Sequence, residues 1–133
     1  MRFLGLIFLL FLGACKPDTT VQGREYTLND ESDLTITLGF DAHTNRYFGK
    51  AVNRYFGKYR ISHSKITFTP PASTMKTGAE EDMLAEEKYF NRLEQVKAYR
   101  ISDKNLTLIL ADGSSLHFIE NQNTPFKKGD DDR

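Results

Sequence analysis

The single cysteine of this sequence, Cys15, stands in a setting suited to covalent modification. It follows Leu12, Gly13 and Ala14, and the two small residues leave the peptide bond before the cysteine open to a peptidase. The thiol of the new first residue can then carry a thioether-linked diacylglycerol. We therefore expect Cys15 to be lipidated and, because there is no second cysteine, no disulfide within the domain.

The residues before the cysteine read as a leader. Arg2 is followed by an apolar run over residues 3–12, which is typical of a signal peptide and too short for a membrane-spanning helix of about 20 residues. Leader and cysteine together resemble the lipobox of bacterial lipoproteins. An Asp directly after the cysteine would resemble the signal that retains bacterial lipoproteins in the inner membrane, but this chain has Lys16 there. We therefore expect an envelope protein on the outer membrane, facing the periplasm.

The other residue types that carry out chemistry are poorly placed for it. His43, His63 and His117 lack the spacing of a zinc site, and no second cysteine completes one, so no metal or cofactor is expected. Glu86 and Glu87 are neighbours on a predicted helix and point about 100° apart, so they cannot act on one substrate atom. We expect one of them to reach a sheet residue and the other to be solvated. The sequence therefore favours a protein that is not an enzyme.

A repeated hexapeptide, Asn-Arg-Tyr-Phe-Gly-Lys, occupies residues 45–50 and 53–58. At strand spacing its Arg, Phe and Lys share one face and its Tyr and Gly share the other. We expect the two copies to form neighbouring strands of one sheet, near its centre. The candidate ligand-binding residues are Arg46, Lys50 and Lys58, with an anionic lipid or a polysaccharide as the ligand.

Two further expectations concern this repeat. If the lysine face is solvated, Phe48 and Phe56 are exposed. The mixture of basic and aromatic residues could also suit single-stranded nucleic acid, but a lipid-anchored domain outside the cytoplasm seldom meets one. The chain has 18 basic and 18 acidic side chains, so it has no overall charge bias towards nucleic acid either.

The remaining pattern predicts an α+β fold: a curled, barrel-like antiparallel meander of seven or eight strands with one packed helix. Thr77 and Glu80 fit a capping box for a helix over about 78–95. The predicted strands cover residues 25–28, 34–40, 46–50, 54–59, 65–69, 96–101, 106–110 and 116–119. The predicted organisation is a signal peptide at 1–14, a lipidated cysteine and tether at 15–23, a domain at 24–120 and a disordered tail at 121–133.

The order of these motifs resembles the META domain, as in HslJ-like heat-shock lipoproteins. The resemblance rests on a glycine-bearing strand, the turn Ala51-Val52-Asn53, an aromatic-Gly-aromatic strand, a Thr/Met segment at 73–77 and the helix that carries Tyr89, Phe90 and Leu93. Two family cysteines are replaced by Val52 and Thr77, and their joint loss fits a pair that would otherwise bond. Because Val52 replaces the cysteine of the family's turn, the resemblance implies that Val52 is buried.

The resemblance implies an envelope setting and a link to stress tolerance, without an established reaction. The function expected from the sequence is thus a non-enzymatic, membrane-anchored lipoprotein that binds or supports envelope components under stress. An alternative from another class is an inhibitor of an envelope hydrolase, or a small ligand-binding protein. The expected partners are the membrane, through Cys15, and an envelope protein or an anionic lipid or polysaccharide.

Overall fold

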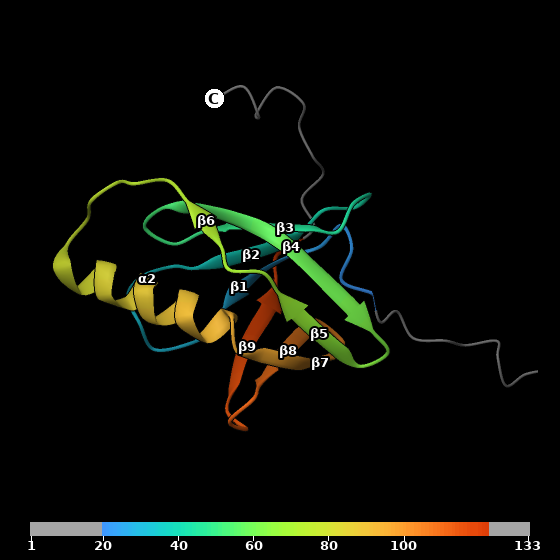
Figure 1. Ribbon diagram of the computed structural model, residues 1–133. Helices are drawn as coiled ribbons and strands as arrows, with labels where there is room; N and C mark the ends of the chain where they lie inside the picture. The colour runs from blue at the N-terminus through green and yellow to red at the C-terminus, as the bar shows by residue number, and fades with distance from the viewer. Residues whose placement is uncertain (1–19, 123–133) are drawn as a thin grey trace, which may run out of the picture.

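Nine strands and one helix account for most of residues 20–122, which are the residues that the computed structural model describes (Figure 1). The predicted leader, Cys15 and nearly all of the predicted tail lie outside these residues. The elements are β1 (Glu25–Leu28), β2 (Thr37–Phe40), β3 (Arg46–Lys50), β4 (Arg54–Ser62), β5 (Lys65–Phe68), β6 (Ala72–Ser73), α2 (Glu80–Leu93), β7 (Val96–Ser102), β8 (Asn105–Leu110) and β9 (Ser115–Glu120).

The strands form a closed antiparallel barrel, which confirms the predicted fold class. Their order is β3-β2-β1-β9-β8-β7-β5-β4-β6, and β3 also pairs with β4, so the ring closes through the hairpin that carries the repeat. The short strand β6 pairs with β4 outside the ring, which leaves eight strands in the barrel. Because a closed ring has no central strand, the expectation that the hairpin lies at the centre of a sheet is corrected.

The barrel encloses the core because apolar and polar residues alternate along its strands. Strand β8 shows this plainly, since Leu106, Leu108 and Leu110 are buried and the residues between them are not. The largest fully buried side chains include Tyr26, Phe40, Tyr47, Tyr55, Leu93 and Phe118. The core is rich in aromatic side chains, and several of its rings meet edge to face.

Helix α2 lies beside the barrel, below β6 in Figure 1, and buries Tyr89 and Leu93 against it. It is shorter than the predicted span, and the predicted capping box is wrong. Ala79 is the N-cap residue and makes no side-chain capping hydrogen bond. The segment before it is held elsewhere, because the backbone N–H of Lys76 donates to Asn53 Oδ1 at 2.5 Å. The acidic first turn of the helix still complements its dipole.

Two more sequence-based expectations need correction. The predicted strand over residues 34–40 begins only at Thr37, although Ile36 is buried before it. Val52, which we expected to be buried, is half-buried in the β3–β4 turn, where the residues on either side of it are buried instead. The closest atom to a Cβ built on Gly78 is a Val52 methyl, at 3.2 Å. The segment around Thr77 therefore does lie against Val52, as the paired loss of two family cysteines implies.

Candidate functional site

The outward face of the β3–β4 hairpin gathers the candidate ligand-binding residues. We call it the hairpin face, and it consists of Arg46, Phe48, Lys50, Arg54, Phe56 and Lys58. The two hexapeptides pair antiparallel so that Phe48 lies opposite Phe56, with a cationic pair on each side of them. All six side chains are exposed. The three predicted residues, Arg46, Lys50 and Lys58, are thus brought together, and Arg54 joins them as the repeat equivalent of Arg46.

The two phenylalanines form an apolar strip in the middle of this face. Phe48 is 37% exposed and Phe56 is 51% exposed, as expected for a solvated lysine face. The ring of Phe48 leans over Gly39 of β2, where a Cβ would come within 2.5 Å of its Cζ atom. A glycine at position 39 therefore lets the ring lie flat against the barrel. On the other side Phe56 neighbours Ala72 of β6, so small residues flank the strip.

The four cations of the hairpin face lie in like-charge pairs. Arg46 is directly opposite Lys58, and Lys50 is directly opposite Arg54. Like charges in facing positions destabilise a β-sheet by several tenths of a kcal/mol or more. Within residues 20–122 none of the four forms an ion pair that would offset this repulsion. The hairpin therefore keeps an unfavourable charge arrangement that an anionic partner would relieve.

The inner face of the hairpin is a layer of two tyrosines, Tyr47 and Tyr55. Each repeat tyrosine covers the glycine opposite it, Tyr47 over Gly57 and Tyr55 over Gly49. The Tyr55 hydroxyl donates to the backbone carbonyl of Thr37 and lies 2.6 Å from the Tyr89 hydroxyl. Burial raises the pKa of the Tyr55 and Tyr89 hydroxyls well above the ordinary value. The layer thus ties hairpin, barrel and helix together through neutral hydroxyl groups.

Below the hairpin turn, Asn53 and Glu86 form a buried polar link. The Glu86 carboxylate accepts from the Asn53 backbone N–H at 2.7 Å and from its side-chain amide at 3.1 Å. Asn53 Oδ1 accepts from the Thr74 hydroxyl at 2.9 Å. Glu86 is the helix glutamate that reaches across, although its partner Asn53 lies in the turn between two strands and not in the sheet, and Glu87 is exposed as expected. Glu86 therefore joins the helix to the hairpin turn.

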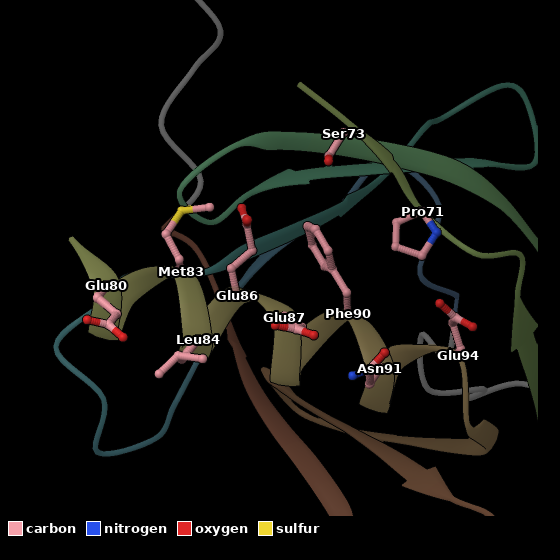
Figure 2. Close-up of a pocket in the computed structure, with 10 residues that line it drawn as sticks. All are labelled: Pro71, Ser73, Glu80, Met83, Leu84, Glu86, Glu87, Phe90, Asn91 and Glu94. Atoms are coloured by element: carbon pink, nitrogen blue, oxygen red, sulfur yellow. The ribbon is translucent and has the colours of Figure 1, made fainter. Parts of the chain in front are cut away.

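A cleft of about 440 Å³ lies between α2 and β6. Figure 2 shows Glu86 and Phe90 pointing from the helix into this space, with Pro71 and Ser73 on the strand segment across from them. Glu80, Glu87 and Glu94 stand along the helical side of the opening. No pattern in the sequence singled out this cleft, because its two walls are brought together only by the fold.

Each of the three histidines lies in a different turn or strand. His43 and His63 are exposed in two different turns, and His117 is exposed on β9, with its Nδ1 atom 3.4 Å from the Thr107 hydroxyl. Among residues 20–122 no group of three or more His, Cys, Asp or Glu side chains could hold a metal ion. Across the same residues, no helix combines the length and the apolar character needed to cross a bilayer.

The comparisons with known proteins decide the family. The family model of the META domain matches residues 18–123, which is most of the chain. The chain belongs to the META domain family. No curated protein sequence matches it significantly.

Solved structures agree with this META domain fold. An NMR structure of a protein from Burkholderia xenovorans has a TM-score of 0.68 at 18% identity, covering 82% of this chain and 94% of its own. A second NMR structure has a TM-score of 0.57 at 17% identity, covering 74% and 90%. The crystal structure of a DUF4847 family protein from Bacteroides vulgatus has a TM-score of 0.51 at 13% identity, covering 67% and 61%. At these identities the likeness concerns the fold of the META domain.

Sequence reasoning missed two features of the site. It left Arg54 out of the binding set, although the repeat makes Arg54 the counterpart of Arg46. It also gave no role to Asn53. The resemblance offered a signal for Asn53, since this residue belongs to the turn Ala51-Val52-Asn53 on which the resemblance rests. A short polar side chain in a turn between two apolar strands can cap neighbouring backbone groups, and here it fixes the 74–76 segment and the helix.

Proposed function

We propose that the protein is a non-enzymatic envelope lipoprotein whose hairpin face binds the anionic lipid headgroups of the membrane that holds its anchor. The observation that carries this proposal is the set of four cations, without ion pairs in the described chain, around the exposed Phe48 and Phe56. Membership of the META domain family supports an envelope setting. Holding the domain against the membrane would let it support the envelope under stress.

The residue types of the hairpin face suit a bilayer interface. A Lys or Arg near an anionic membrane contributes about 1 kcal/mol of attraction, so four cations give roughly 4 kcal/mol before salt screening. Exposed phenylalanine rings gain further free energy when they leave water for the boundary of the acyl chains. A purely polar polyanion would profit from the cations and leave the apolar strip in water. An anionic lipid surface therefore fits the whole face better than a polysaccharide does.

The start of the described chain supports an anchor on Cys15 close to this face. Thr20 and Gln22, at the start of the described chain, line the same surface pocket as Asn45 and Tyr59. These two residues adjoin Arg46 and Lys58, so the chain enters the barrel beside one end of the hairpin face. Thr20 lies five positions after Cys15, and five residue steps span roughly 18 Å at full extension. A lipid on Cys15 would hold the hairpin face within reach of the headgroups.

The anchor itself is tested by metabolic labelling with palmitate in the wild type and in Cys15→Ala. We expect the wild type to be labelled and the variant to be unlabelled, because the thiol is the attachment point. Fractionation of labelled cells then tests the proposed outer-membrane location, which rests on Lys16 after the cysteine. Equal labelling of the two proteins would remove the anchor from the proposal.

Docking of the hairpin face can be followed by fluorescence because the chain has no tryptophan. In Phe56→Trp the new indole is a single reporter on the apolar strip. The lipidated full-length variant is reconstituted in vesicles of phosphatidylcholine, with or without phosphatidylglycerol. We expect a blue-shifted emission and quenching by brominated acyl chains in the anionic vesicles, with the effect weakening as salt is added.

A matched reporter is Ile119→Trp, because Ile119 is an exposed apolar residue on β9, on a distant part of the ring. Its emission is expected to be the same in both kinds of vesicle. If Phe56→Trp also emits as in water in anionic vesicles, the face does not dock on lipid. Retention of the protein on an anionic polysaccharide in that case would identify the polysaccharide as the ligand instead.

A further inference from the structure

The edge of β6 that faces away from β4 carries a free backbone donor and acceptor. In the β4–β6 ladder Ser73 is opposite Tyr55, and the Thr74 N–H donates to the Arg54 carbonyl. Neighbouring residues of an antiparallel strand point their backbone groups to opposite sides. The N–H and C=O of Ser73 therefore point away from β4, and no group among residues 20–122 pairs with them. This edge borders the cleft, because Ser73 and Pro71 line it.

The floor of the cleft is apolar and firmly supported. Phe90 and Met83 point into it from the helix (Figure 2), and both are half-buried. The Phe90 ring packs on Tyr55, with their centroids 5.1 Å apart. Glu86 stands between Met83 and Phe90 on the helix, and its carboxylate is held by Asn53. A side chain that enters the cleft meets a preformed apolar surface, so little ordering of the protein opposes binding.

The opening of the cleft is uniformly acidic. Glu80, Glu87 and Glu94 line it, all exposed, and no Lys, Arg or His is among its lining residues in the described chain. The basic helix residue Arg92 is directed elsewhere, since its guanidinium donates to the Ser114 hydroxyl at 2.9 Å. A positive side chain beside the edge strand would face three carboxylates without a competing cation.

We propose that the cleft between α2 and β6 binds an extended peptide segment in which basic and apolar residues alternate. The peptide adds to the free edge at Ser73 through a pair of backbone hydrogen bonds, as in β-augmentation. Side chains of an extended peptide alternate between two faces. One set then enters the cleft above Phe90, and the other set brings positive charge to Glu87 and Glu94. This site lies on the helix side of β6 and does not depend on the hairpin face.

The test uses the lipidated full-length protein in detergent and a fluorescein-labelled hexapeptide of alternating valine and lysine, followed by fluorescence anisotropy. Saturable binding is expected, and replacing each lysine by glutamate is expected to abolish it. Backbone N-methylation at the central valine keeps the charge but removes the donor to the edge strand, and we expect it to weaken binding about tenfold. Equal binding of the methylated peptide would overturn the proposal in favour of charge attraction alone.

Two pairs of matched variants locate the site. Ser73→Pro removes the outward N–H and spares the ladder to β4, whereas Ser73→Ala keeps that N–H. Glu87→Lys reverses a charge in the cleft, and Glu81→Lys makes the same change on the same helix outside it. We expect Ser73→Pro and Glu87→Lys to lose binding about tenfold and the two controls to keep it. Binding unchanged in Glu87→Lys would overturn the proposal even if Ser73→Pro failed to fold.

Discussion

Asn53 donates to the carboxylate of Glu86 from its backbone N–H at 2.7 Å and from its side-chain amide at 3.1 Å, and these hydrogen bonds hold the hairpin turn against the helix. Both side chains are at least 95% buried. Asn53→Ala would remove the amide and leave a buried carboxylate with one donor less. We expect the free energy of unfolding in urea to fall by about 3 kcal/mol.

A double variant separates the pair from the packing around it. In Asn53→Ala with Glu86→Leu, the unpaired charge is absent, so we expect the double variant to be more stable than Asn53→Ala alone. Glu87→Gln, on the exposed neighbour, is expected to change stability by less than about 0.5 kcal/mol. If the stability lost in the double variant equals the sum of the losses in Asn53→Ala and in Glu86→Leu alone, the two residues act independently.

The glycines of the repeat leave room for the tyrosines opposite them. A Cβ on Gly49 would lie well inside van der Waals contact with the Thr37 carbonyl oxygen, and 2.5 Å from the Tyr55 hydroxyl. Because the carbonyl belongs to a paired strand and cannot move, we expect Gly49→Ala to cost about 3 kcal/mol. Gly113→Ala meets no atom within 4 Å but has a positive φ, so about 1 kcal/mol is expected. Thermal unfolding of both variants checks the order.

Charge reversal on the hairpin face is expected to leave the fold intact. Lys50→Asp with Lys58→Asp turns both like-charge pairs into opposite-charge pairs with Arg54 and Arg46. The melting temperature should stay within about 3 °C of the wild type or rise slightly, while docking on anionic vesicles is lost. Because Val52 is half-buried, we expect Val52→Asp to lower the free energy of unfolding by about 1–2 kcal/mol, which is less than a fully buried charge would cost. Unfolding caused by the lysine reversals would contradict the exposure of this face.

The buried tyrosines predict a loss of stability at high pH. Burial raises the pKa of Tyr26 to about 12, and burial also raises the pKa of Tyr47, Tyr55 and Tyr89 above the ordinary value of 10.0. Above pH 10 these groups ionise in the unfolded chain and stay neutral in the folded one. Their stabilisation is therefore complete below pH 10 and declines above it, by about 1.4 kcal/mol per tyrosine and pH unit.

The measurement for this prediction is a titration of tyrosinate absorbance alongside far-ultraviolet circular dichroism. We expect most of the absorbance change to coincide with unfolding, between pH 10 and about 12. Tyr26→Phe is a useful comparison, because the Tyr26 hydroxyl is buried without a hydrogen-bond partner among the described residues. Its alkaline transition should move to higher pH. Gradual ionisation of all tyrosines in a folded protein would contradict the buried layer.

The alternation of the repeat was enough to predict the two faces of the hairpin. Tyr47 and Tyr55 are buried and Phe48 and Phe56 are exposed because strand geometry alone separates them. The closure of the barrel was harder to read. It depends on the pairing of β1 with β9, whose residues lie about 90 positions apart, and no local pattern marks that register.

Elsewhere tertiary contacts overrode local signals. The Thr77 capping box fits the residue types, yet the preceding segment is drawn to Asn53 and the helix starts at Glu80 with no side-chain cap. Strand alternation places Val52 on the same exposed face as Lys50, whereas the resemblance to the family predicts a buried residue. The half-buried Val52 side chain has an exposure between these two expectations. The cleft was invisible in the sequence because Ser73 and Phe90 meet only after the helix has folded back under β6.

The register of the two hexapeptides gives the hairpin face a local twofold axis that passes between Phe48 and Phe56. Rotation by half a turn about this axis exchanges Arg46 with Arg54 and Lys50 with Lys58, so the face presents the same groups from either end. A partner that binds along the strands therefore has two orientations of nearly equal energy. This degeneracy adds about 0.4 kcal/mol to binding through the entropy of two arrangements. It also means that the hairpin face cannot read the direction of a linear ligand.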